Sequence, residues 1–380
     1  MTITLPRFTS RVIWLSFLGL TYFYCGPTPE KLIEKSHTAS AREEYDAALL
    51  YMKNAYELSL PKEFFLVDRD ESFSLLRASL NGEKVYLVEK KAAKKIFEKT
   101  AIYFLNRSEG KNRKKRKKFE GKIRDLQISP SGEYAAILQQ PTEEMKECNI
   151  FVWSPDQGDV LEVGKSHCNS KPAVKNDGSV WYLRQDQIHT FQFSTNQSTL
   201  FNKGRKPEKT VQKFPAYAYF YASPDDALWL IYGAAGSYRL YRLDQKIKLV
   251  STEIASQKLY LVANIQKAGV FTGGAGVQQF VILDPKTSSV IHRMKAKPWG
   301  DAAFLSDKDC YYIEDGILTH RTGDKDEELP FWAEQLAIGM KGELLFLSST
   351  GSAMHASNIA PPPEALKIYE KGVEIDDSKS

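Results

Sequence analysis

The sequence is poor in the features on which several protein classes depend. Four cysteines in 380 residues are too few for a small scaffold built on disulfides. The only long apolar run lies at the N-terminus, which excludes a protein that crosses a membrane several times. With 42% hydrophobic and 26% charged residues, wholesale disorder is excluded too. The chain is therefore globular, and it is long enough for one large domain or two of ordinary size.

Short motifs that mark enzymes and metal sites are also missing. The sequence contains no G-x-S-x-G, no H-E-x-x-H and no C-x-x-C, and its six histidines are scattered. No cysteine and histidine cluster has the spacing of a metal site. We therefore expect no metal, no cofactor and no catalytic residue that spacing alone would reveal.

The N-terminal segment is typical of an export signal. Arg7 and Arg11 precede the apolar stretch Val12–Tyr24, which is too short to span a bilayer but fits the apolar core of a signal peptide. Cys25 follows directly. The segment resembles the signal of bacterial lipoproteins, in which the cysteine after the apolar core is lipidated and becomes the first residue.

This resemblance implies a signal peptide over residues 1–24 and lipidation of Cys25. The protein would then be exported and anchored as a lipoprotein in the membrane of the bacterial cell envelope, on its periplasmic or surface face. Bulky Tyr22, Phe23 and Tyr24 stand where such signals have small residues. A signal cleaved elsewhere, an uncleaved anchor and a cytosolic chain are the alternatives.

Export changes the interpretation of the other cysteines. Cys148 and Cys168 lie on segments that we expect to form neighbouring strands or loops. In an oxidising compartment they can form a disulfide. The alternative is that Cys148, Cys168 and Cys310 are buried free thiols.

Positive charge is concentrated in one short run. Residues 111–122 carry more positive charge than the net +5 of the whole chain. The run is either a solvated loop between two structural units or a surface for anionic lipid or polysaccharide. Nucleic acid is not an expected partner, because no aromatic residues interleave with the run and export conflicts with that role. The candidate polyanion-binding residues are Lys111, Arg113, Lys114, Lys115, Arg116, Lys117 and Lys118.

Residues 25–62 are expected to form a linker and one short helix. Apolar residues recur at spacings of three and four from Tyr45 to Leu58. Ser40 and Glu43 have the spacing of a capping box, and Pro61 ends the pattern.

From residue 63 to 371 short strands alternate with tight turns. The clearest unit, residues 123–164, reads as four strands rich in aromatic and β-branched residues. Similar units precede and follow it, and the turns between their first and second strands recur at intervals of about 34 to 50 residues, the range of one four-stranded blade. They cover residues 72–106, 171–201, 216–252, 258–294, 299–330 and 332–371.

Two segments sharpen this pattern. LQISPSGEYAAI (126–137) and YFYASPDDALWLIY (219–232) resemble the Ser-Pro-Asp-Gly hairpin of TolB-like and WD-repeat-like β-propellers. The resemblance implies an all-β propeller over residues 63–371, and the number of repeated units favours seven blades over six. The tail at 372–380 is expected to be disordered. The ring would close through 63–67 or 366–369. A β-sandwich or two small β domains are the alternative.

One unit is unusually aromatic. Tyr217, Tyr219 and Tyr221 share one face of a strand by period two. They form either packing between blades or an aromatic surface near the central channel.

The export signal and the propeller pattern together favour a binding function over an enzymatic one. We expect a protein- or glycan-binding or scaffolding module at the cell envelope, held to the membrane by its lipid. One alternative is a propeller hydrolase or lyase with acidic residues in the channel. Another is a surface protein that binds polyanions through residues 111–118.

Overall fold

The chain divides into two units, which are described separately. One contains residues up to Leu60 together with those from Pro361 onward, and the other is Pro61–Ala360. No helix in the described ranges is long and apolar enough to cross a membrane. The structure, a computed structural model, describes residues 27–377 except 68, 70, 93, 94, 96, 109–112, 202–216, 224–226, 235, 236, 244–246, 263–266, 273–278, 285, 286, 288, 296–298 and 357–359.

The first unit is helical and joins both ends of the chain. It consists of α2 (Pro29–Ser40), α3 (Tyr45–Ser59) and α4 (Pro363–Asp377), with α3 packed against both other helices. Its core includes Tyr56, whose ring centroid lies 5.9 Å from that of Tyr369. The Oγ of buried Ser36 donates a hydrogen bond to the Ala48 carbonyl at 2.8 Å, which ties α2 to α3.

Several expectations for this unit were wrong. Two helices, not one, occupy the segment before Pro61, and Glu44 rather than Ser40 precedes the second, without a side-chain cap. The backbone N–H of Glu44 instead donates to the Ala39 carbonyl at 3.0 Å, which closes the turn after α2. The described part of the expected disordered tail, residues 372–377, belongs to α4. So do residues 366–369, which were the alternative strand for closing the ring.

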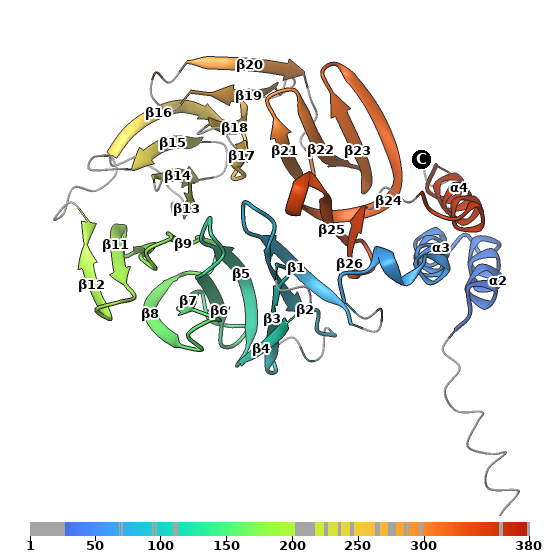
Figure 1. Ribbon diagram of the computed structural model, residues 1–380, viewed down its shortest axis with the longest axis horizontal. Helices are drawn as coiled ribbons and strands as arrows, with labels where there is room; N and C mark the ends of the chain where they lie inside the picture. The colour runs from blue at the N-terminus through green and yellow to red at the C-terminus, as the bar shows by residue number, and fades with distance from the viewer. Residues whose placement is uncertain are drawn as a thin grey trace, which may run out of the picture. The chain divides into compact units, whose positions relative to one another are not determined.

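The second unit begins with four separate four-stranded antiparallel sheets (Figure 1). Figure 1 shows β12, β16 and β20, the fourth strands of their blades, at the rim of the unit. The strands of the first two sheets are β1 (Phe73–Ala78), β2 (Lys84–Glu89), β3 (Thr100–Asn106), β4 (Arg113–Phe119), β5 (Lys122–Ile128), β6 (Ala135–Gln140), β7 (Glu147–Trp153) and β8 (Val160–His167). Those of the next two are β9 (Ala173–Val174), β10 (Val180–Arg184), β11 (Gln187–Gln192), β12 (Gln197–Leu200), β13 (Tyr217–Ala222), β14 (Leu228–Ala234), β15 (Ser237–Leu243) and β16 (Ile247–Ile254).

The remaining strands form one ten-stranded sheet that contains three blades. A parallel pair, Val262↔Phe304, joins the first strands of two neighbouring blades, and the long β24 is shared between the last two. Four separate sheets and these three blades make seven, as favoured from the sequence. The strands are β17 (Tyr260–Val262), β18 (Lys267–Thr272), β19 (Gln279–Leu283), β20 (Val290–Lys295), β21 (Ala302–Ser306), β22 (Asp309–Glu314), β23 (Ile317–Thr322), β24 (Lys325–Ile338), β25 (Leu344–Ser348) and β26 (Ala353–Ala356).

The ring closes through the segment that precedes the first blade. After the short 3-10 helix η1 (Lys62–Phe64), Phe65 pairs with Met354, and the N–H of Leu66 donates to the Ala353 carbonyl at 2.9 Å. The expected closure through residues 63–67 is therefore confirmed. Blades 7 and 1 also meet at Gly82, which has φ 68° and where a Cβ would lie 2.0 Å from the Gly339 carbonyl carbon.

The core lies between neighbouring blades rather than within one sheet. One cluster joins blades 1 and 2, with the rings of Tyr86 and Trp153 edge to face at 5.9 Å. Another joins blades 5 and 6, where Phe280 and Phe304 stack at 5.2 Å. Because a four-stranded sheet exposes two apolar faces, stacking the sheets side by side buries both.

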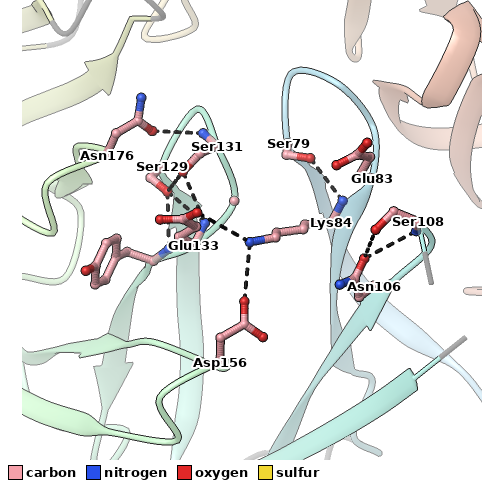
Figure 2. A network of polar contacts seen from close by, with 12 residues as sticks. Ser79, Glu83, Lys84, Asn106, Ser108, Ser129, Ser131, Glu133, Asp156 and Asn176 are labelled. Carbon is pink, nitrogen blue, oxygen red and sulfur yellow. Dashed lines mark hydrogen bonds and ion pairs between the residues drawn. The ribbon is translucent and has the colours of Figure 1, made fainter.

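The Ser-Pro-Ser-Gly motif of blade 2 acts as a turn, as expected. Ser129 Oγ accepts hydrogen bonds from the N–H groups of Glu133 and Tyr134 at 3.1 and 3.2 Å, and Gly132 has φ 72°. Figure 2 shows that the turn also reaches blade 3, because the Ser131 N–H donates to Asn176 Oδ1 at 2.8 Å. The contacts of the motif therefore explain it as a structural turn.

Candidate functional site

The first strands of the blades surround a cavity of about 490 Å³, which we call the central cavity. Its volume lies in the range of small-molecule sites. Residues of all seven blades line it. The polar ones are Arg77, Ser79, Gln127, Lys171, Tyr221, Lys258, Asp301, Glu334 and Gln335.

Asp125 of β5 is the buried acid beside this cavity. Its side chain is 5% exposed, and its Oδ1 lies 3.4 Å from Arg77 Nη2 and 3.9 Å from Lys171 Nζ. Gln127 Nε2 donates to Oδ2 at 2.7 Å. Burial acts to raise the pKa of Asp125, but Lys171, Arg77 and the Gln127 hydrogen bond together hold it below its ordinary value. Asp125 is therefore a fixed negative charge between two cations.

Arg77 has a structural role, because its donors are used within the protein. Its Nε donates to the Leu126 carbonyl at 3.0 Å, and its Nη1 donates to the Leu76 carbonyl at 2.8 Å and to Gln335 Oε1 at 3.1 Å. These bonds connect blades 1, 2 and 7 on the inner side of the ring.

Lys171 and Lys258 are held more loosely. The side chain of Lys171 is 34% exposed, and its 3.9 Å separation from Asp125 exceeds hydrogen-bond length. Lys258 Nζ donates to the Gly300 carbonyl. Partial desolvation of this ammonium lowers the pKa of Lys258; Asp301 acts in the opposite direction, and Lys171 and Arg77 lower it further. The cations therefore influence one another across the cavity.

Asp301 differs from Asp125 in the direction of its pKa shift. Burial raises the pKa of Asp301, against the opposing effects of its hydrogen bond from the Leu336 N–H and of Lys258 and Arg77. That bond, to Oδ2, measures 2.9 Å. A carboxyl with a raised pKa near an ammonium with a lowered pKa is an arrangement that can transfer a proton.

A second cavity of about 550 Å³ shares Lys171 with the central cavity and is also lined by Asp125. Tyr217 and Tyr219 line the second cavity, and Tyr221 lines the first. Tyr219 is at the same time 3% exposed and part of the core between blades 4 and 5. The aromatic face of β13 thus takes part in both core packing and cavity lining.

The structure joins Cys148, in β7, and Cys168, directly after β8, in a disulfide with a Cα–Cα distance of 4.9 Å. Cys310 is a buried free thiol, and burial raises its pKa to about 12. Cys25, the expected lipidation residue, and residues 1–24 lie outside the described residues. Within the described part of the chain, no three His, Cys, Asp or Glu side chains gather so that they could hold a metal ion.

The basic run is a strand and not the expected loop. Its residues from Arg113 form β4, which pairs along its whole length with β3. Lys115 Nζ lies 3.1 Å from Asp156 Oδ1 and 2.8 Å from the Pro155 carbonyl. Lysines protect an edge strand from pairing with other chains, while their aliphatic stems cover apolar surface. Charge alone is therefore a poor sign of a loop at a sheet edge.

Only part of the run has contacts that explain it. Arg116 lies over the Tyr103 ring at 5.1 Å and 3.8 Å from Glu89 Oε1. Lys118 is exposed and Lys117 is half-buried. Lys111 lies outside the described residues, and the structure describes only the backbone of Arg113 and Lys114. The structure does not bring the described residues of this run to the central cavity.

The residues of the central cavity were missed from the sequence because no local motif contains them. Arg77, Lys171 and Lys258 belong to blades 1, 3 and 5. A usable signal was present nonetheless. In IRDLQIS, Asp125 is an acidic residue within a predicted strand, and superimposing the repeated units would have placed such residues around one axis.

Solved structures with the same fold are β-propellers. The β-propeller domain of the Trilobed protease from Pyrococcus furiosus is 14% identical, with 74% of this chain and 93% of that chain covered and a TM-score of 0.50. A catalytically inactive virginiamycin B lyase from Staphylococcus aureus is 12% identical, with coverage of 78% and 99% and a TM-score of 0.52. The Swd1 propeller domain from Myceliophteria thermophila is 12% identical, with coverage of 78% and 99% and a TM-score of 0.51.

These similarities define the class of the protein: its strand-built unit is a β-propeller. No protein-family model matches the sequence. The comparison with curated proteins finds no match either. At these identities the structural neighbours show the fold alone, and they include both enzymes and a WD-repeat domain.

Proposed function

We propose that this protein is an exported β-propeller, anchored through Cys25 to a membrane of the bacterial cell envelope, that binds a protein or glycan partner there. The disulfide between Cys148 and Cys168 is the observation that best supports export, because such bonds persist in oxidising compartments and are rare in the cytosol. The apolar segment before Cys25 supports export too.

A binding function is favoured because the best-defined charged groups of the channel are committed to structure. Asp125 and Arg77 tie blades to one another, and the conspicuous turn motif serves only as a turn. The resemblance to TolB-like propellers points to envelope assembly or scaffolding by analogy.

Measurement of the intact mass and cell fractionation of the native protein test its export and its lipid anchor. We expect the protein in the membrane fraction, without residues 1–24 and with a diacyl or triacyl mass on its first residue. In a Cys25→Ser variant the lipid mass should disappear and the protein should leave the membrane fraction. A native chain that is full-length, unmodified and free of membrane contradicts the proposal.

The polyanion alternative predicts a strong dependence on salt. Binding of heparin or anionic vesicles through β4 should weaken steeply between low and physiological ionic strength, because exposed charges are screened. Lys117→Gln combined with Lys118→Gln should weaken it further. Binding that is independent of salt, or unaffected by these substitutions, removes this alternative.

A second candidate function, a propeller hydrolase or lyase, rests on Asp301 and Lys258. Their opposite pKa shifts fit a proton-transfer pair in the central cavity. Incubation of the protein with envelope extracts, followed by mass spectrometry, tests it. New products formed by the native protein but not by Asp301→Asn would show that the protein is an enzyme rather than a binding module.

A further inference from the structure

The central cavity has the size and walls of a site for a small molecule. Its volume of about 490 Å³ could enclose a ligand of drug size. Apolar residues form much of the wall, among them Leu261, Ala337 and Ile338, which are half-buried. These walls suit an aromatic or aliphatic body.

Positive charge faces this apolar space. Lys171 of blade 3 and Lys258 of blade 5 line the cavity. The third cation, Arg77, donates its hydrogen bonds to groups of the protein. An ammonium group has three donors. The Asp125 contact of Lys171 is longer than a hydrogen bond, and Lys258 bonds to the Gly300 carbonyl. Both lysines therefore retain donors for a ligand.

The nearby acids do not cancel this charge. Asp125 is shared between Arg77 and Lys171. Burial raises the pKa of Asp301, and Glu334 is exposed, so that water screens its charge. The positive charges of Lys171 and Arg77 lower the pKa of Lys258, because they repel its ammonium group. An anion that binds between the cations offsets this repulsion, so the cavity favours an anion over a neutral ligand.

We propose that the central cavity binds a small organic anion, a carboxylate or phosphate carried on an apolar or aromatic body, through the ammonium groups of Lys171 and Lys258. The apolar body packs against Leu261, Ala337 and Ile338. This site depends neither on export nor on the envelope partner proposed above, so the two proposals can fail separately.

Calorimetric titration of the purified protein tests the site with phenylacetate, phenyl phosphate, phenylacetamide and inorganic phosphate. We expect both organic anions to bind at least about tenfold more tightly than phenylacetamide, which lacks the charge. They should also bind more tightly than inorganic phosphate, which lacks the ring. Phenylacetamide that binds as well as phenylacetate overturns the proposal, and so does inorganic phosphate that matches phenyl phosphate.

Substitutions locate the site. Lys171→Ala and Lys258→Ala should each reduce the affinity for phenyl phosphate about tenfold or more. Lys165→Ala, at an exposed lysine of β8 in blade 2, is the matched control and should leave it unchanged. Unchanged affinity in both cavity variants overturns the assignment.

A measurement without substitution guards against variants that fail to fold. Phenyl phosphate should slow hydrogen exchange in β17 and β21 of the unaltered protein, because both strands contribute to the cavity wall. Binding without protection of these strands places the ligand elsewhere and rules the cavity out.

Discussion

The fold places two sets of basic side chains differently. The inner set is Arg77, Lys171 and Lys258, and the outer set is the run 115–118 on β4. The outer set is continuous in sequence and faces acids such as Asp156, whose side chain is 53% exposed. The inner set comes from three blades, and two of its members, Arg77 and Lys171, face Asp125, which is 5% exposed. Since water screens the outer charges, three inner cations from separate blades can contribute more to stability and binding than the continuous basic run.

The largest expected difference between the two sets is in stability. Asp125→Ala leaves Arg77 and Lys171 without their buried partner and should lower the free energy of unfolding by about 3–5 kcal/mol. Asp156→Ala removes the outer partner of Lys84 and Lys115 and should cost about 0–1 kcal/mol. Urea unfolding of both variants measures the difference. Equal losses would show that position in the ring does not decide the value of these pairs.

Loss of the disulfide should have the next largest effect on the free energy of unfolding. One of its cysteines, Cys168, lies three residues before Lys171 of the inner set. Its loop spans a sequence separation of 20, so Cys148→Ala with Cys168→Ala should lower the free energy of unfolding by about 3 kcal/mol. Reduction of the unaltered protein with dithiothreitol should have a similar effect, and the double variant should not respond to it. A response of the double variant would mean that the reductant acts elsewhere.

Asp301, which lies beside the inner set, should make the stability of the protein depend on pH. Its pKa is raised, so the folded state holds a proton that the unfolded state releases near pH 3.8. The free energy of unfolding therefore falls as pH rises from that value through the folded pKa. Asp301→Asn removes this loss and should be more stable than the native protein at neutral pH, by up to about 1 kcal/mol. Urea midpoints between acid and neutral pH test the sign, and a less stable variant at neutral pH contradicts it.

The smallest effect is expected in the outer set. Lys117→Gln combined with Lys118→Gln should change the free energy of unfolding by less than about 0.5 kcal/mol, because the side chains lie at a solvated sheet edge. Turbidity on prolonged storage should increase, since these lysines discourage pairing between edges. Circular dichroism and light scattering follow the two properties. A large loss of stability would show that β4 is held by its charges.

The blades were predictable because their signals are local. The unit 123–164 became β5 to β8, Lys122 to His167, since its turns need Gly and Ser at given positions and its strands need alternating apolar residues. The Ser-Pro-Ser-Gly turn behaves as its residues dictate, whatever lies around it.

The failures have physical causes. Residues 113–118 form a strand because the neighbouring β3 offers a partner for its backbone, which outweighs the preference of a basic run for solvent. Residues 363–377 form α4, whose Ala365 and Ile368 are buried. A short helix gains its stability from such packing more than from its own residues.

Sequence by itself determined the repeated strands and their turns, because each depends on residues within a few positions of one another. It favoured seven blades over six through the number of repeated units. Tertiary structure alone decided the central cavity. Lys171 and Lys258 lie in different blades, far apart in the sequence, and only ring closure through Phe65 and Met354 brings such residues around one axis. A site assembled from distant strands leaves no spacing in the sequence, because its geometry exists only once the ring has formed.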